Sequence, residues 1–257
     1  MTQLAEPVSA AVAAPPATSA LPIATAPEAD AETAVCPFGA AASEGSYTQT
    51  PRSTPARYPD RASHDRAAVH AVLDEALVCH IAFVVDGAPV VLPTVHARVG
   101  DTLYVHGSTG GRWATLDGQP VGVTVTLLDG LIFGRSWMHH SAPFRCVVVH
   151  GTVRIVEDHD ERIAAMRALI EHVQPGRADD SREPSKKELA ATAIVAVDLM
   201  EVSLKVRGNH VADLESDLDG PHWAGVIPLR LVAGDPIPAA DLRPGIEAPE
   251  YAFGYRR

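Results

Sequence analysis

Apolar residues recur at helical spacing in two segments of this chain. In Asp65–Ala76 they form one face of a predicted helix, and Ser63 or Asp65 is positioned to cap its start. Asp160–Val173 shows a second amphipathic pattern, which ends before a Pro-Gly pair. A shorter helix is predicted from Ser185, which begins a capping box of the form Ser-x-x-Glu.

Short extended runs rich in valine occupy most of the chain between the two longer helices. Asp86-Gly87, Gly100-Asp101 and Asp129-Gly130 separate several of them. Asp-Gly between two extended runs is a strong hairpin signal, because both positions tolerate positive φ. Six such runs without a long intervening helix predict an antiparallel sheet that closes as a barrel. The runs are Val78–Val85, Val90–Ala97, Thr102–Gly107, Val121–Leu128, Leu131–Trp137 and Arg145–Val156.

Two further extended segments follow the second helix. Ile194–Val206 is predicted as one long strand, in which apolar and polar residues alternate toward the end. Trp223–Leu229 is apolar and leads into a proline-rich end, which predicts an edge strand followed by coil. The pattern therefore predicts one mainly β domain, an antiparallel barrel with helices packed outside it.

Residues 1–56 differ in composition from the rest of the chain. Sixteen of them are Ala and eight are Pro, and no Lys or Arg precedes Arg52. The prolines interrupt any helix that the alanines favour, and there are too few large apolar residues to offset the entropy of ordering. This composition predicts a disordered tail over 1–56 and a folded domain with a C-terminal extension over 57–257.

The charge balance and the cysteines narrow the function further. The chain has 32 acidic and 21 basic residues, which argues against nucleic acid as a partner, because duplex binding needs clustered Lys and Arg. No apolar run approaches the roughly 20 residues that span a bilayer, and the start lacks the pattern of a secretory signal. The three cysteines form no CxxC pair, which favours a reducing, cytoplasmic compartment.

The segment Leu103–Arg112 contains the residue types that bind phosphate. A predicted strand leads into a loop of Gly, Ser and Thr that ends in an arginine. Glycines let backbone amides approach an anion, hydroxyls donate further bonds, and Arg offers a bidentate fork. The same residues also make an ordinary flexible turn. The loop is not a Walker A motif, because no Gly-Lys-Ser/Thr follows.

A second polar segment, Arg135–Val147, contains the pair His139-His140. Such histidines serve as proton donors, anion binders or metal ligands, whereas those of a plain surface loop bond only to backbone or water. Adjacent strand residues face opposite sides, so the sequence does not rank one above the other. No metal site is expected, because the 12 histidines form no HExxH motif and the cysteines lack ligand spacing.

Several short motifs follow one another over residues 57–232. They are Val-Val-Leu-Pro-Thr, Leu-Tyr-Val-His-Gly-Ser-Thr-Gly-Gly-Arg, His-His-Ser, Phe-Arg-Cys-Val-Val-Val-His-Gly and Trp-Ala-Gly-Val-Ile-Pro-Leu. Their order resembles the FMN-binding split-barrel superfamily of pyridoxamine 5'-phosphate oxidase, and within it the flavin-nucleotide-binding branch that includes nitroimidazole-resistance proteins. The resemblance implies a six-stranded antiparallel split barrel and a homodimer with FMN at its interface.

The resemblance also implies which residues contact the flavin. Pro93 and Thr94 correspond to the strand that lies along it. The residues that hold its ribityl chain and phosphate or lie near it are His106, Ser108, Thr109, Gly110, Arg112, Arg145 and, from the partner chain, Trp223. A less basic phosphate cluster and no evident C-terminal Arg pattern argue against vitamin B6 oxidation. The short loop after Arg112 leaves F420 or haem open as alternative cofactors.

These observations give three hypotheses for the function. In the first, the protein is an FMN-dependent oxidoreductase that reduces or oxidises a small molecule, with His140 as proton donor. In the second, the barrel carries flavin, F420 or haem for storage or sensing, without turnover. In the third, the protein is structural and its barrel is empty.

Overall fold

A computed structural model describes residues 45–255. Its helices are α1 (Arg66–Glu75), α2 (His159–Val173) and α3 (Lys186–Ala191). Its strands are β1 (Ala62–Ser63), β2 (Val78–Val85), β3 (Ala88–Val99), β4 (Thr102–Ser108), β5 (Pro120–Leu128), β6 (Gly130–Phe133), β7 (Phe144–Ile155), β8 (Thr192–Asp198), β9 (Glu201–Arg207) and β10 (Gly225–Pro228).

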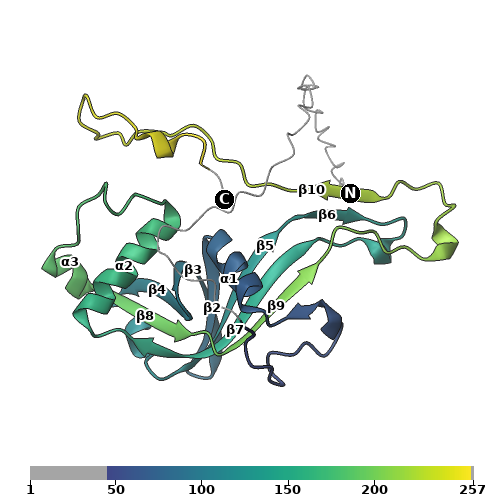
Figure 1. The fold of residues 1–257 in the computed structure, drawn as a ribbon, viewed down its shortest axis with the longest axis horizontal. Helices are drawn as coiled ribbons and strands as arrows, with labels where there is room; N and C mark the ends of the chain where they lie inside the picture. Colours follow the sequence, from purple (N-terminus) through teal and green to yellow (C-terminus); the bar gives the residue numbers. More distant parts are fainter. Residues whose placement is uncertain (1–44, 256–257) are drawn as a thin grey trace, which may run out of the picture. The chain divides into compact units, whose positions relative to one another are not determined.

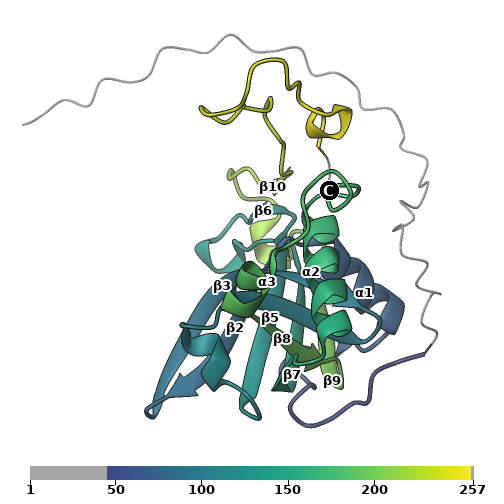
Figure 2. The same ribbon diagram turned by 90° about the vertical axis from the view of Figure 1, so that its left-hand side faces the viewer.

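Six antiparallel strands form a closed barrel, in the order β7-β5-β2-β3-β4-β8 (Figures 1 and 2). The ring closes because β7 pairs with β8 as well as with β5. β9 and β1 extend the sheet on the other side of β7, and β6 and β10 form a separate two-stranded sheet. The prediction of a mainly β antiparallel barrel with peripheral helices is confirmed.

The sequence predicted one long strand over Ile194–Val206, and this prediction is wrong, because the structure has two strands there. The chain leaves the ladder after Asp198, where the Leu199 amide donates to the Asp101 carbonyl at 2.8 Å. The buried Leu199 side chain joins the core there, so the segment divides into β8 and β9. β8 closes the barrel, whereas β9 pairs with the opposite edge of β7.

The predicted hairpin at Asp129-Gly130 is also wrong. The Asp129 amide donates to the Pro143 carbonyl at 3.0 Å, and the chain turns away from the barrel. β6 ends at Phe133 and pairs with β10, while β5 pairs with β2 and β7. β8 therefore takes the sixth place in the barrel that the sequence assigned to Leu131–Trp137.

Local signals in the sequence explain the other boundaries. Asp86 and Gly87 both adopt positive φ, at 51° and 78°, and join β2 to β3 in the predicted hairpin. The Asp65 carboxylate accepts a hydrogen bond from the Ala68 amide at 2.8 Å and caps α1. The capping box predicted at Ser185 is present at the start of α3.

The core fills the barrel and continues beneath α1. Ile81, Val123, Val147 and Val195, from four different barrel strands, are each at most 1% exposed. α1 adds its own buried apolar face to the same cluster. α1 and α2 lie side by side (Figure 2), linked by a 2.7 Å hydrogen bond between His172 Nε2 and the carbonyl oxygen that follows α1.

Residues 45–56, which the sequence assigned to the tail, pack against the barrel. Tyr47 is only 3% exposed, and Arg52 forms a two-point ion pair with Glu201 on β9. One buried aromatic residue in a run of small ones is enough to anchor this segment to the barrel. The folded part therefore begins N-terminal of residue 57, and the rest of the predicted tail, residues 1–44, lies outside the described residues.

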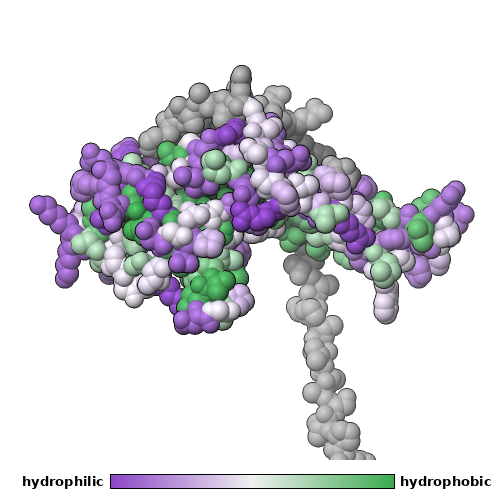
Figure 3. Space-filling model, turned by 90° about the horizontal axis from the view of Figure 1, so that it is seen from below, coloured by the Kyte–Doolittle hydropathy of each residue, from purple (hydrophilic) through white to green (hydrophobic). Residues whose placement is uncertain are grey.

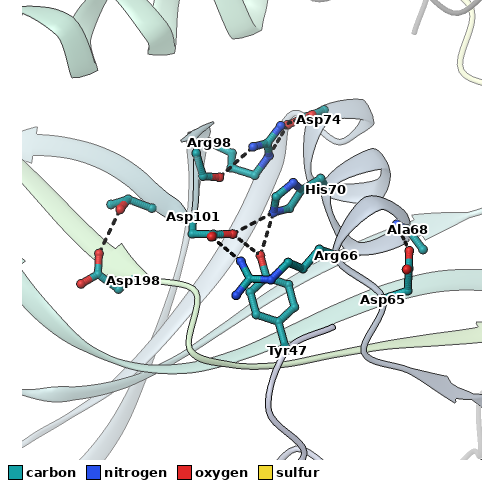
Figure 4. A network of polar contacts seen from close by, with 11 residues as sticks. Tyr47, Asp65, Arg66, Ala68, His70, Asp74, Arg98, Asp101 and Asp198 are labelled. Carbon is teal, nitrogen blue, oxygen red and sulfur yellow. Dashed lines mark hydrogen bonds and ion pairs between the residues drawn. The ribbon is translucent and has the colours of Figure 1, made fainter. Parts of the chain in front are cut away.

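The Tyr47 hydroxyl joins a partly buried polar network (Figure 4). It donates to Asp101 Oδ1 at 2.8 Å and lies 2.7 Å from His70 Nε2, while Arg66 pairs with the other carboxylate oxygen. Burial, reinforced by Asp101, raises the pKa of Tyr47, and burial lowers the pKa of His70. Burial opposes ionisation of Asp101, but hydrogen bonds from Tyr47 and Arg66 outweigh it and lower that pKa.

We expect Tyr47→Ala to lower the free energy of unfolding by about 3–5 kcal/mol, the usual cost of truncating a buried aromatic residue. Tyr47→Phe keeps the ring and loses the hydroxyl, so its expected cost is about 1 kcal/mol. Phe253→Ala is the control, because this ring is 57% exposed. Urea denaturation measures all three, and equal losses for Tyr47→Ala and Phe253→Ala would show that the segment does not pack on the barrel.

We expect stability to fall as the pH drops below about 6.5, the ordinary pKa of histidine. The unfolded chain binds a proton at His70 in this range, whereas the folded chain, whose His70 pKa is lowered, does not, and this difference favours unfolding. Denaturation of wild type and His70→Gln at pH 7.5, 6.5 and 5.5 tests this. The variant should lose less stability than wild type on acidification, and parallel curves would contradict the assignment. His210→Gln, at an exposed position, is the control.

Candidate functional site

The predicted phosphate loop follows β4 directly and is tied to α3. Gly107 has no room for a side chain, because a Cβ there would lie 2.1 Å from the Trp113 indole. The amide and the hydroxyl of Thr109 both donate to the carbonyl oxygen of Ala191, at 3.0 and 3.2 Å. These contacts fix the course of the loop and use both donors of Thr109.

The other loop amides are also used internally. Gly110 N donates to Ser108 Oγ at 3.2 Å, and Gly111 N donates to the Ser108 carbonyl at 2.9 Å. Arg112 is exposed at the start of a short 3-10 helix, and its guanidinium has no hydrogen bond or ion pair among the described residues. The loop thus offers an anion the Arg112 guanidinium and the Ser108 hydroxyl proton, rather than the cradle of amides that the sequence predicted.

β3 and β4 diverge beside this loop. β4 pairs with β3 only from His96 onward, so the earlier part of β3 lacks a β4 partner. Pro93, which is exposed, and Thr94 lie on this open stretch. A proline has no N–H to donate, and on an unpaired strand edge this costs no hydrogen bond of the sheet. His106 is exposed and follows directly after the last β3–β4 pair. The structure therefore brings Pro93, Thr94, His106 and the loop to one opening of the barrel.

Arg145 lies away from the opening, at the start of β7. Its guanidinium bonds both oxygens of Glu75 and both oxygens of Asp129, with three of the four contacts between 2.7 and 3.0 Å. Hydrogen bonds to Glu75 and then to Asp129 raise the pKa of Arg145 well above its usual value. Two carboxylates thus balance the charge of this residue, and the cluster joins α1 to the ends of β5 and β7.

His140 and Trp223, the predicted proton donor and the predicted partner-chain contact, both lie against the ring of Phe133. Both rings are 5.8 Å from the Phe133 ring, centre to centre. His140 Nδ1 is 2.9 Å from the Ser136 carbonyl oxygen. Because a carbonyl oxygen only accepts, Nδ1 carries the proton in the neutral ring, and Nε2 presents a lone pair.

His139 differs from its neighbour in environment. Its Nδ1 lies 3.3 Å from Asp213 Oδ1, and this carboxylate has a side chain only 1% exposed. Arg135 binds Asp213 through its backbone amide at 3.0 Å and its guanidinium at 2.8 Å. Burial opposes ionisation of Asp213, but these bonds from Arg135 lower its pKa. His139 is thus held by a charged partner, whereas His140 is exposed.

A pocket of about 500 Å³ lies beside the two histidines, and we call it the cationic pocket. Four basic side chains line it and no carboxylate does. The lining residues are Arg57, Tyr58, Arg61, Met138, His139, His140, Ser141, Phe144, Lys205, Arg207 and Ala212. Its volume is in the range of small-molecule and cofactor sites, roughly 300–1,000 Å³.

The sequence analysis missed this pocket, although two local signals were present. Arg57 and Arg61 flank a Tyr-Pro pair in the segment that leads into the domain, and Lys205 and Arg207 alternate on β9. Alternate strand residues face one side of the sheet. Only the sheet order, with β9 beside β7, brings these two pairs and His140 together.

The described residues contain no group of three or more His, Cys, Asp or Glu that is placed to hold a metal ion. Within the same range, no helix is both long and apolar enough to cross a membrane.

The barrel, its opening at β3 and the basic loop after β4 define a split-barrel protein. A family model described as pyridoxamine 5'-phosphate oxidase matches residues 65–206, more than half of the chain. The chain belongs to this pyridoxamine 5'-phosphate oxidase-like family, as the resemblance implied.

Two solved structures are similar over most of the chain. The flavocytochrome Anf3 from Azotobacter vinelandii is 34% identical, with a TM-score of 0.76, over 80% of this chain and 97% of that one. An FAD and haem binding protein from Mycobacterium smegmatis is 35% identical, with a TM-score of 0.71, over 74% of this chain and 95% of that one. A search of curated proteins finds no match.

Proposed function

We propose that this protein is a flavin-binding oxidoreductase that holds FMN or FAD at the opening between β3 and β4. The observation that carries the proposal is the exposed Arg112, which has no partner among the described residues and lies on the loop beside the open edge of β3. The flavocytochrome and the FAD and haem binding protein, each at least 34% identical, support a flavin as the cofactor.

The residues at the opening fit a flavin nucleotide. Arg112 and the Ser108 hydroxyl would hold a phosphate, and Pro93 and Thr94 would lie along the ring system. His106 would contact the chain between ring and phosphate, since it precedes the loop on β4. A bound flavin supplies electron or hydride transfer, while the protein supplies position and electrostatics.

His140 would reach a flavin at the opening between β3 and β4 only from the other subunit of a dimer. It lines the cationic pocket, and none of the loop residues lines that pocket. We therefore include a homodimer in the proposal.

An apolar strip on β2 and β3 supports the homodimer. Val84 is 63% and Val91 58% exposed, and both belong to the outward set of alternate residues that includes Pro93. Hydrophobic residues form local patches among hydrophilic ones on the face seen from below (Figure 3). A second copy related by a two-fold axis would cover such a strip on both chains at once.

We expect Arg112→Ala to raise the Kd for FMN by about one to two orders of magnitude. A charge-assisted contact to phosphate contributes about 1.5–3 kcal/mol, and each 1.4 kcal/mol is tenfold in Kd. Riboflavin lacks the phosphate, so its Kd should stay within about twofold of wild type. Fluorescence titration of the purified protein with FMN, FAD and riboflavin measures these constants.

Arg243→Ala is the matched control, because Arg243 is another exposed arginine and lies in the C-terminal segment. It should leave all three constants unchanged. Equal losses for FMN and riboflavin in Arg112→Ala would indicate damage to the loop, and no loss for FMN would remove Arg112 from the site. A visible spectrum without a flavin band after addition of FMN or FAD would reject the proposed function.

We expect light scattering of wild type to give twice the mass of one chain. The double substitution Val84→Asp and Val91→Asp should give the mass of a single chain, because it places four carboxylates in an interface with no compensating partner. Leu231→Asp, at an 83% exposed position in the C-terminal coil, should remain dimeric. A monomeric wild type that retains flavin would contradict the dimer.

A further inference from the structure

The four basic residues of the cationic pocket are distinguished by their convergence on one cavity. A missing ion pair is not unusual in this protein, because three exposed arginines outside the pocket also form none among the described side chains. These three are Arg112, Arg230 and Arg243. Arg57, Arg61, Lys205 and Arg207, by contrast, line a single space of about 500 Å³, and no described carboxylate lines it with them. A cleft lined by one sign of charge concentrates ions of the opposite sign.

Strand pairing brings these cations together. β1 pairs with β9, with Ala62 opposite Lys205, so the preceding residue, Arg61, is held beside the strand that carries Lys205 and Arg207. Lys205 and Arg207 are alternate residues of β9 and therefore face the same side of it. Like charges that are crowded in this way repel one another, and a bound anion offsets the repulsion.

Two of the guanidinium groups are held in position by one aromatic ring. Those of Arg57 and Arg61 lie 4.8 and 4.2 Å from the centre of the Tyr58 ring, and Arg57 Nη2 donates to the Tyr58 hydroxyl at 2.9 Å. A cation–π contact orients a guanidinium group and leaves its charge unneutralised. Holding side chains in place before a ligand arrives lowers the entropy that binding costs.

On the other side of the pocket, Arg207 Nε donates to Ser141 Oγ at 2.8 Å. The Ser141 hydroxyl accepts this bond, so its own proton stays available as a donor. The two Nη groups of Arg207 have no hydrogen bond among the described residues. This side of the pocket therefore offers an anion a charged fork and a hydroxyl proton.

The walls of the pocket favour a hydrophilic ligand. Five of the lining residues are exposed, so a ligand there keeps contact with water. They are Arg57, Tyr58, Met138, His140 and Ser141. An open site of this kind binds through charge-assisted hydrogen bonds, because it can bury little apolar surface. Cations on two separate segments match a ligand that carries two negative groups.

We propose that the cationic pocket binds a small hydrophilic anion with at least two negative groups, either carboxylates or phosphates. Arg57 and Arg61 hold one group, and Lys205 and Arg207 hold the other. The Ser141 hydroxyl donates a further hydrogen bond beside Arg207. This inference goes beyond the proposed function and does not depend on it, because none of the residues assigned to the flavin phosphate lines this pocket.

Calorimetric titration of the purified full-length protein at constant ionic strength tests the ligand. Citrate and pyrophosphate are the probes for the carboxylate and phosphate forms, and at least one of them should bind at one ion per chain. Acetate should bind weaker than that probe by about tenfold or more, because a single negative group reaches only one of the two pairs of cations.

Two double substitutions test the cations. Arg57→Gln with Arg61→Gln should weaken the binding of the probe by about tenfold to a hundredfold, the effect of losing charge-assisted contacts. Lys205→Gln with Arg207→Gln should do the same, because one ligand contacts both pairs. Arg230→Gln with Arg243→Gln is the matched control, since it removes the same charge at exposed positions outside the pocket. It should change the Kd by less than about twofold, because isolated surface charges are screened.

Thermal unfolding and flavin titration of each variant report whether it is folded. Weakening in both folded pocket variants, with the control unchanged, supports the site. Equal weakening in the control overturns it, because the attraction would then come from the overall charge of the chain. Loss of the probe in Arg112→Ala, with the pocket variants unchanged, also overturns it and places the anion at the loop after β4.

The outcomes for wild type separate the two proposals. Wild type that binds flavin but neither citrate nor pyrophosphate overturns this inference and leaves the proposed function standing. Wild type that binds a probe at the pocket but no flavin supports this inference and rejects the proposed function.

Discussion

The closure of the barrel depends on one long strand with three partners. β7 pairs with β9 as far as His150 and with β5 as far as Thr152, and from Val153 onward it pairs with β8. Gly151 lies where the partner changes, and a Cβ at this residue would come within 2.6 Å of the Val197 side chain. The absent side chain allows β8 to approach β7. Without this contact the sheet would stay open at β8, and the loop after β4, which is tied to the end of α3 beside β8, would lose its support.

The distribution of charge follows from the fold and identifies the two sites. An acidic chain has more carboxylates than cations, so a typical arginine finds a carboxylate within reach. The Arg145 cluster shows the result, since two carboxylates hold one guanidinium between α1 and the sheet. Arg112 and the four cations of the cationic pocket are among the basic residues that form no ion pair within residues 45–255. Arg112 lies on the loop beside the open edge of β3, and the cations of the cationic pocket line a cavity of about 500 Å³.

Features encoded by neighbouring residues could be predicted from the sequence, and features set by distant contacts could not. The Asp86-Gly87 turn and the capping box at Ser185 depend on a few adjacent residues. The break at Leu199 has no glycine or proline to mark it, because its amide is satisfied by Asp101, almost a hundred residues earlier. The loop after β4 was found from its residue types, but the sequence did not show that its amides are used by Ser108 and Ala191. The cationic pocket was missed because three separate segments supply its cations and its histidine.

The two sites lie on opposite parts of the sheet, so the effects of substitutions at one site can be measured separately from those at the other. The opening is formed by β3 and β4, whereas the cationic pocket takes Lys205 and Arg207 from β9. β3 and β9 are four places apart in the strand order, and each inter-strand step is roughly 4.8 Å. Substitutions more than about 7–10 Å apart that share no partners have nearly additive effects. Within one chain, the opening and the cationic pocket therefore share no side chain.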